Sequence, residues 1–117
     1  MDIEKILDHY AICALWSSTD ENDAPLDSFY TIDDIDPNTL EAMRADVIDF
    51  VETNKELLLS SGQSDEQIGH DFWLTRNRHG AGFWDRGLGE IGQKLTKACH
   101  VYGDVYLYVS DNGKVCQ

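Results

Sequence analysis

The residues best suited to chemistry in this chain are concentrated between positions 70 and 86. Eight polar side chains there can move protons or hold an anion: His70, Asp71, Arg76, Asn77, Arg78, His79, Asp85 and Arg86. An enzyme would use one His as general base, an Asp to orient it and an Arg to hold an anionic substrate. No nucleophile accompanies them, since Thr75 is the only hydroxyl from 71 to 89. The sequence therefore indicates no catalytic residue and favours a protein that is not an enzyme.

Residues 71–89, DFWLTRNRHGAGFWDRGLG, form a glycine-rich segment with two Trp, two Phe and three Arg. Aromatic and Arg side chains dominate binding hot spots, and glycine permits sharp bends. One interpretation is a site for an anionic ligand or a single nucleic-acid strand. Its residues would be Arg76, Asn77, Arg78, His79, Asp85 and Arg86. The other is an interior network in which the Arg residues pair with acids and the aromatic rings fill the core.

Motifs for cofactors and metals are weak. His70 and His79 are too far apart for a compact zinc pattern, and the acidic run from Asp20 lacks the glycine and final Glu of a calcium loop. HGAG and GLGEIG match no phosphate-binding loop. The three cysteines include no CxxC, and Cys13 and Cys99 fall on apolar helix faces, which predicts buried structural thiols. No cofactor and no metal is indicated.

Charge divides the chain into two halves. Residues 1–66 hold 17 Asp and Glu against 3 Lys and Arg, whereas residues 67–117 hold 5 against 6, which accounts for the net charge of −13. Such a field repels nucleic acid and anionic membranes and attracts basic surfaces. It is typical either of a solvated, solubilising face or of a surface that occupies a basic site on a partner. The residues expected to form this acidic face are Asp20, Asp23, Asp27, Asp33, Asp34, Asp36, Asp49, Glu52 and Glu56.

The elements that must position these residues are mostly helices. Apolar spacing predicts one helix over 2–16 and a second from Pro37, after an Asp36 N-cap, to about Ser60. Ser64 and Gln67 form a capping-box pattern ahead of a third helix over 65–75. A fourth helix is expected to start near Leu88 and to stop by Gly103.

Strand signals are confined to two places. Residues 29–32 have β character, and residues 105–109 alternate before Asn112-Gly113, a strong two-residue hairpin signal that returns through 114–116. The prediction is a single α+β domain over 1–117. It has about four helices with a small antiparallel C-terminal hairpin or three-stranded sheet. No apolar run is long enough to span a membrane, and the acidic start does not suit a secretory signal, so a cytoplasmic protein is expected.

Three stretches carry a resemblance to other proteins. FWLTRNRHGAGFWDRGLGEIGQKLT, with AICALWSST near the start and VYLYVSDNGKV near the end, resembles small acidic proteins of bacteriophages and mobile elements. The resemblance supplies no catalytic residues. It implies an accessory protein that works in the host cytoplasm by binding and redirecting host machinery, including defence systems.

Together these features predict a binding protein whose acidic N-terminal half docks on a basic host or phage protein. Because a basic, nucleic-acid-binding partner is expected, the face could act as a DNA mimic or as an anti-defence inhibitor. Direct nucleic-acid binding is disfavoured by the net charge. Two alternatives stay open: a ligand site in the glycine-rich segment, and a homodimer that pairs the acidic half with the near-neutral half of another copy.

Overall fold

The computed structural model describes residues 1–117 and contains five α-helices and one two-stranded antiparallel sheet. The helices are α1 (Ile3–Ser17), α2 (Pro37–Thr53), α3 (Lys55–Ser61), α4 (Asp65–Arg76) and α5 (Glu90–His100), and the strands are β1 (Tyr108–Val109) and β2 (Val115–Cys116). Three short 3₁₀ turns occupy the connections: η1 (Leu26–Ser28), η2 (Ile32–Asp34) and η3 (Phe83–Asp85). The mostly helical α+β prediction is confirmed, although the helix count is five and not four.

Three helices start at polar caps that are readable in the sequence. The carboxylate of Asp2 accepts from the second and third backbone N–H groups of α1. Asp36 does the same for α2, with Pro37 at the first helical position, and the Ser64 hydroxyl accepts from Gln67 N at the start of α4. These side chains satisfy N–H groups that have no partner inside the helix, so they determine where each helix begins.

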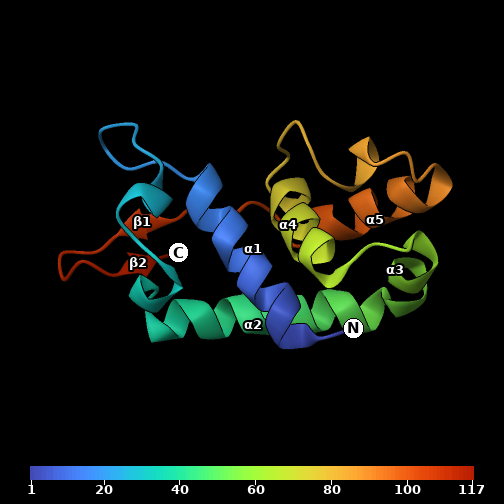
Figure 1. The fold of residues 1–117 in the computed structure, drawn as a ribbon, viewed down its shortest axis with the longest axis horizontal. Coiled ribbons are helices and arrows are strands. Elements are labelled where there is room, and N and C mark those ends of the chain that lie inside the picture. The colour runs from blue at the N-terminus through green and yellow to red at the C-terminus, as the bar shows by residue number, and fades with distance from the viewer.

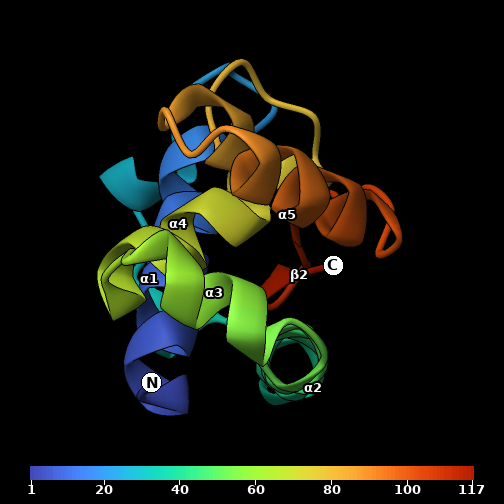
Figure 2. The same cartoon turned by 90° about the vertical axis from the view of Figure 1, so that its right-hand side faces the viewer.

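The prediction of a single helix from Pro37 to Ser60 is wrong, because the helix is interrupted at Asn54. That residue leaves the helical conformation (φ −113°, ψ 20°), and its side-chain amide donates to the Phe50 carbonyl oxygen at 2.9 Å. A short polar side chain that bonds to nearby backbone competes with the regular helix. The break turns α3 toward α5, on which it packs (Figure 2).

The tightest helix pair in the molecule is α1 with α4, which cross near its centre (Figure 1). Gly69 allows the approach, because a Cβ there would collide with the Ile6 carbonyl oxygen and lie 2.8 Å from Tyr10 N. Around the crossing, the Phe50 and Phe72 rings stack with centroids 4.1 Å apart. The Tyr10 ring lies edge-on to that of Trp73. The helix faces that the periodicity predicts as buried do form this core.

No strand forms at 29–32, so of the two predicted alternatives the hairpin is present and the three-stranded sheet is not. Asp34 accepts from Thr31 N at 2.8 Å and closes a local capping box around η2. The side chain thereby takes a backbone N–H group that a strand ladder would need. The nearest pairing to the hairpin lies outside this stretch: Ile35 forms an isolated parallel bridge with Val115, and Asp36 N donates to Val115 O at 2.8 Å.

The C-terminal hairpin is present, but its turn is one residue longer than predicted. Val109 pairs with Val115, and Ser110 N donates to Lys114 O at 2.8 Å. Within the loop Gly113 N donates to Ser110 O at 2.9 Å. This is a three-residue loop closed by a left-handed Gly, the second common way to join two antiparallel strands.

The fourth helix of the prediction, expected to start near Leu88, is α5 and starts at Glu90.

The molecule is elongated, 43 Å along its longest axis and 24 and 21 Å along the others. In Figure 1, α2 runs along the bottom and connects the two ends. The hairpin and the turns between α1 and α2 lie at one end, while α3 and α5 lie at the other. No helix combines the length and apolar character that a membrane span requires.

Candidate functional site

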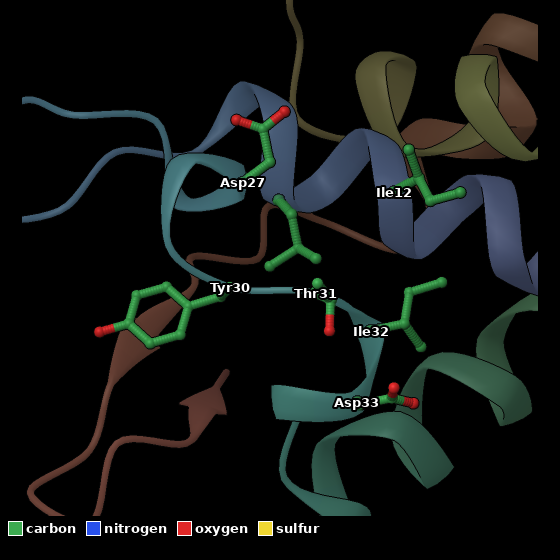
Figure 3. Close-up of a pocket in the computed structure, with 7 residues that line it drawn as sticks. Ile12, Asp27, Tyr30, Thr31, Ile32 and Asp33 are labelled. Carbon is green, nitrogen blue, oxygen red and sulfur yellow. The ribbon is translucent and has the colours of Figure 1, made fainter.

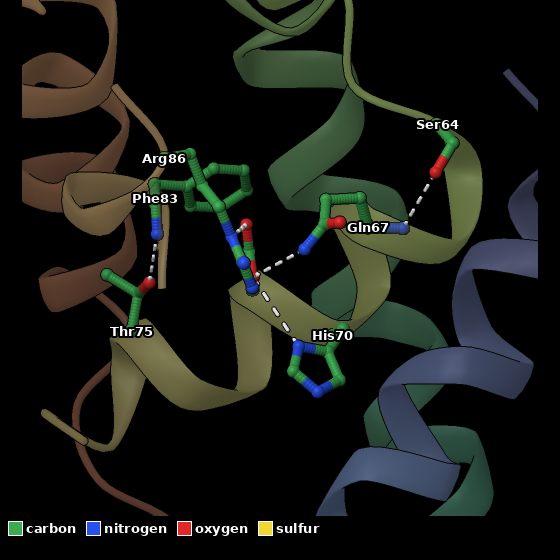
Figure 4. A network of polar contacts seen from close by, with 7 residues as sticks. Ser64, Gln67, His70, Thr75, Phe83 and Arg86 are labelled. Atoms are coloured by element: carbon green, nitrogen blue, oxygen red, sulfur yellow. Dashed lines mark hydrogen bonds and ion pairs between the residues drawn. The ribbon is translucent and has the colours of Figure 1, made fainter. Parts of the chain in front are cut away.

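The glycine-rich segment begins inside α4, where Asp71 is fully buried. Arg86 reaches it from the far end of the segment in a bidentate pair, with Nε to Oδ2 at 3.0 Å and Nη2 to Oδ1 at 2.8 Å. Gln67 Nε2 donates to the same carboxylate at 3.2 Å, and His70 Nδ1 lies 3.5 Å from it (Figure 4). Fork-to-fork pairs of this kind give both energy and geometric specificity. Arg86 therefore links the end of the loop to the middle of α4.

Arg76, at the end of α4, is buried and connects four parts of the chain. Its guanidinium donates to Tyr10 Oη at 3.0 Å and to Asp46 Oδ2 at 2.7 Å. It also donates to the carbonyl oxygens of Tyr102 and Gly103, both at 2.9 Å, just beyond α5. These carbonyls follow a helix C-terminus, where a cation is favoured. The guanidinium is thus committed to internal partners and is not offered to a ligand.

Asn77 and Thr75 hold the loop that follows α4. Asn77 donates from Nδ2 to Trp73 O at 3.0 Å and accepts from Val105 N at 2.8 Å, which anchors the chain beyond α5. Thr75 Oγ1 accepts from Phe83 N at 3.1 Å. At Gly82 the backbone has φ of 145°, and a Cβ would collide with that same Thr75 hydroxyl. The glycine is needed so that the loop can fold back onto α4.

The six residues of the predicted ligand site therefore do not converge. Arg76 and Asn77 are engaged in internal contacts, Arg86 pairs with Asp71, and Asp85 is exposed without an ion pair. Arg86 faces a hollow of about 380 Å³ on the side of α4 that carries His70. Arg78, His79, Asp85 and Arg86 are all exposed, but only Arg78 and His79 line one hollow together. This arrangement is close to the interior network that the sequence analysis gave as the other interpretation. The sequence did not identify Asp46 as the acid that pairs with Arg76.

Arg78 and His79 do border a separate hollow of about 190 Å³, the Trp84 hollow. Its lining consists of Thr75, Arg78, His79, Trp84, Thr96 and His100. The Trp84 side chain is 54% exposed, unlike that of Trp73. Partial burial, followed by the nearby charge of Arg78, lowers the pKa of His100, while Asp104 opposes the shift. Sequence spacing did not connect His100 with this segment, because the two meet only when α5 packs beside α4.

The cysteines and titratable groups elsewhere offer no obvious reactive centre. Burial raises the pKa of the Cys13 thiol to about 12 and raises that of Cys99 as well, with Asp71 adding to both shifts. Both thiols stay protonated near neutral pH and pack as small apolar groups, as the helical pattern predicts. No group of three His, Cys, Asp or Glu side chains is arranged to hold a metal ion.

The acidic face has two classes of carboxylate. Asp20, Asp34 and Asp36 accept from backbone N–H groups in their own turns, and Asp49 accepts from the Tyr102 hydroxyl. The other five have no ion pair and no side-chain hydrogen bond, and all are exposed: Asp23, Asp27, Asp33, Glu52 and Glu56. Three members of the face therefore stabilise their own turns, Asp49 makes a tertiary contact, and five carboxylates are free to meet a partner.

The cations of the N-terminal half do not neutralise this face. Lys5 pairs with Glu66 at 3.6 Å, and Arg44 pairs with Glu4. Within residues 1–66 the only other carboxylate in an ion pair is Asp46, which binds Arg76. The third cation, Lys55, is exposed and makes no ion pair. Because the remaining acids of residues 1–66 have no ion-pair partner and far outnumber it, the surface of this half carries a negative potential.

Two hollows open among these acids at the hairpin end of the molecule. The larger, about 490 Å³, is bordered by the 19–22 turn and by β1, with Asp20, Glu21 and Asp111 in its wall. The other, about 350 Å³, lies between α1 and the η1–η2 connection and is called here the α1 hollow (Figure 3). Its lining residues are Ile12, Leu15, Asp27, Tyr30, Thr31, Ile32 and Asp33.

Compared with protein-family models, with curated proteins and with solved structures, the chain matches none of them.

Proposed function

We propose that this protein is a non-enzymatic binding protein whose acidic face docks on a basic surface of another protein. The observation that carries the proposal is the set of exposed, unpaired carboxylates at Asp23, Asp27, Asp33, Glu52 and Glu56. Unpaired charges of one sign steer oppositely charged partners and raise association rates. Nucleic-acid-binding proteins present such basic surfaces, so the favoured partner is a host or phage protein of that class.

A narrower version is that the face replaces DNA on its partner and thereby blocks a defence system. The charge density bears on this version. Along this helical stretch Asp49, Glu52 and Glu56 follow one another at three or four residues, about 5 Å of helix rise per charge, whereas duplex DNA carries about one charge per 1.7 Å of axis. The helix alone is too sparse to imitate a duplex. Mimicry would require the carboxylates between 20 and 36 to act beside it.

The experiment is a tagged capture from nuclease-treated bacterial lysate, washed at low and moderate salt and analysed by mass spectrometry. The test variant is Asp27→Asn with Asp33→Asn, because neither carboxylate caps a turn. A second variant, Glu52→Gln with Glu56→Gln, probes the α2–α3 end. The matched control is Glu90→Gln with Asp104→Asn, which removes two exposed carboxylates from the other half of the chain.

We expect salt-sensitive capture of a basic protein that the first variant loses and the control keeps. Substituting Asp34 or Asp36 would be a poorer test, because both accept backbone hydrogen bonds whose loss costs about 1 kcal/mol each. Capture that is equal for the first variant, the second variant and the control would contradict the proposal.

A second candidate function is supported by the Trp84 hollow. It brings a guanidinium, two imidazoles and an exposed indole to one place in a chain that is otherwise strongly acidic. These groups suit a small anionic ligand with an aromatic ring. Titration with a nucleoside monophosphate, followed at the Trp84 indole N–H by NMR, tests it. Arg78→Ala with His79→Ala should abolish the shift while Tm is unchanged, and an unaltered indole signal would exclude the ligand.

A further inference from the structure

The α1 hollow has an apolar floor and an acidic rim. Leu15, buried, and Ile12 come from α1, and Tyr30 and Ile32 come from the η1–η2 connection. In Figure 3 Asp27 lies in the upper part of the view and Asp33 in the lower part, with Ile12 and Ile32 to the right and Tyr30 to the left. A volume of about 350 Å³ is at the small end of the range for ligand pockets, which is about 300–1,000 Å³.

The apolar surface continues outside the hollow. Ile12 is 47% exposed although it lies in the middle of α1, and Trp16, one turn later on the same helix, is 56% exposed. Single exposed apolar residues are ordinary, but large ones that adjoin an apolar hollow mark an interaction surface. Trp is also among the residue types most enriched at binding hot spots.

The rim has charge of only one sign. Asp27 and Asp33 take part in no ion pair, and neither does Asp8, which lies one turn before Ile12 on α1. The nearest basic residue along this helix, Lys5, is already paired with Glu66. An apolar centre inside a polar rim is the usual anatomy of a protein interface. Cations that pair with the carboxylates of this rim must therefore come from the partner.

We infer that the α1 hollow receives an aliphatic side chain of the basic partner, with Lys or Arg residues on both sides of it pairing with Asp27 and Asp33. This inference rests on the proposed function and adds the chemistry of the bound segment. That segment is basic and amphipathic, with apolar side chains on one face, and is not uniformly charged. Electrostatic attraction accelerates the association of the two proteins, and burial of the apolar side chain provides most of the affinity and fixes the position of the bound segment.

The probes are two synthetic peptides of equal length and equal Lys content. One carries Leu at two positions a helical turn apart, and the other carries Ser there. Affinities are measured by calorimetry on the full chain, and the contact is located from backbone amide shifts. We expect the Leu peptide to bind at least about tenfold more tightly, since burying one such side chain suffices for that difference. Its largest shifts should fall at Ile12, Thr31 and Ile32.

Variants separate the anchor from the charges. Ile12→Ser should reduce the affinity for the Leu peptide to that for the Ser peptide, whereas Ile12→Met should retain most of it. The matched control is Leu59→Ser, which removes a comparably exposed aliphatic side chain (60% exposed) from α3 and should change nothing. Circular dichroism of each variant checks that α1 is intact.

Three outcomes would overturn the inference. If both peptides bind equally, and Asp27→Asn with Asp33→Asn weakens both, docking in the hollow is wrong while the acidic face stands. If the Leu peptide binds at Ile12 but is insensitive to salt and to that double variant, its lysines contribute nothing to binding and the proposed function fails as well. If sedimentation shows that the chain self-associates and Ile12→Ser abolishes this, the occupant is a second copy of the chain.

Discussion

At the scale of single residues, Arg76 separates the two interpretations of the glycine-rich segment. Its guanidinium is directed at Tyr10, Asp46 and the chain after α5, so it acts as an internal support. We expect Arg76→Lys to destabilise the protein by about 3 kcal/mol, because a single ammonium cannot replace the fork and leaves some of its four partly buried acceptors unpaired. That figure allows for the 35% exposure of Asp46.

Chemical denaturation measures this effect, with Arg78→Ala as the control. The Arg78 side chain has no hydrogen bond and is exposed, so its truncation should change the free energy of unfolding by less than about 0.5 kcal/mol. Equal stabilities for the two variants would mean that the Arg76 network does not support the fold.

The titration of His100 is a second prediction at this scale. Burial and the charge of Arg78 lower its pKa below 6.5, so the unfolded chain binds this proton more readily than the folded one. Its contribution therefore favours the folded state above about pH 6.5 and is lost as pH falls through the lowered pKa. In an NMR titration we expect Arg78→Ala to raise the pKa of His100 and Asp104→Asn to lower it. Unchanged midpoints would show that the Trp84 hollow is not arranged as described.

At the scale of elements, the crossing of α1 and α4 depends on Gly69. Ala is usually the better helix residue by about 1 kcal/mol, but a methyl group here meets backbone of α1. We expect Gly69→Ala to cost about 3 kcal/mol, at the upper end for overpacking, because backbone cannot move aside as a side chain can.

The control for that substitution is Gly80→Ala in the loop after α4. A methyl group at Gly80 would have no neighbouring atom within 4 Å, and the backbone there has no positive φ, so Ala should be neutral or slightly stabilising. Thermal unfolding of both variants decides the point. A Gly69→Ala protein as stable as the Gly80→Ala protein would exclude a close helix crossing.

At the scale of the whole molecule, the distribution of charge predicts a response to salt. Most carboxylates of residues 1–66 lack a cation partner, and their mutual repulsion opposes the folded state. Because about 0.1 M salt reduces the screening length to about 10 Å, we expect Tm to rise with NaCl concentration. Asp27→Asn with Asp33→Asn should show a smaller rise, measured by calorimetry. A Tm that falls with salt would mean that ion pairs outweigh repulsion.

Local sequence signals were sufficient for most of the helical framework. Residues only a few positions apart determine the caps at Asp36 and Ser64, the buried faces of α1, α2 and α4, and the hairpin. Capping and apolar periodicity act over such short stretches of sequence. The same locality explains the errors. At Asn54, Thr31 and Ser110, short polar side chains or a longer turn redirect the backbone, and the apolar pattern does not record this competition.

Only the tertiary structure decided which polar residues of the glycine-rich segment are available. Arg76 meets Tyr10 across 66 positions of the chain, and Arg86 meets Asp71 across 15. The α1 hollow likewise exists only because the η1–η2 connection folds back beside α1. Residue types state which contacts are chemically possible, whereas packing determines which are made, because a buried polar group must find its partner wherever the fold brings one within reach.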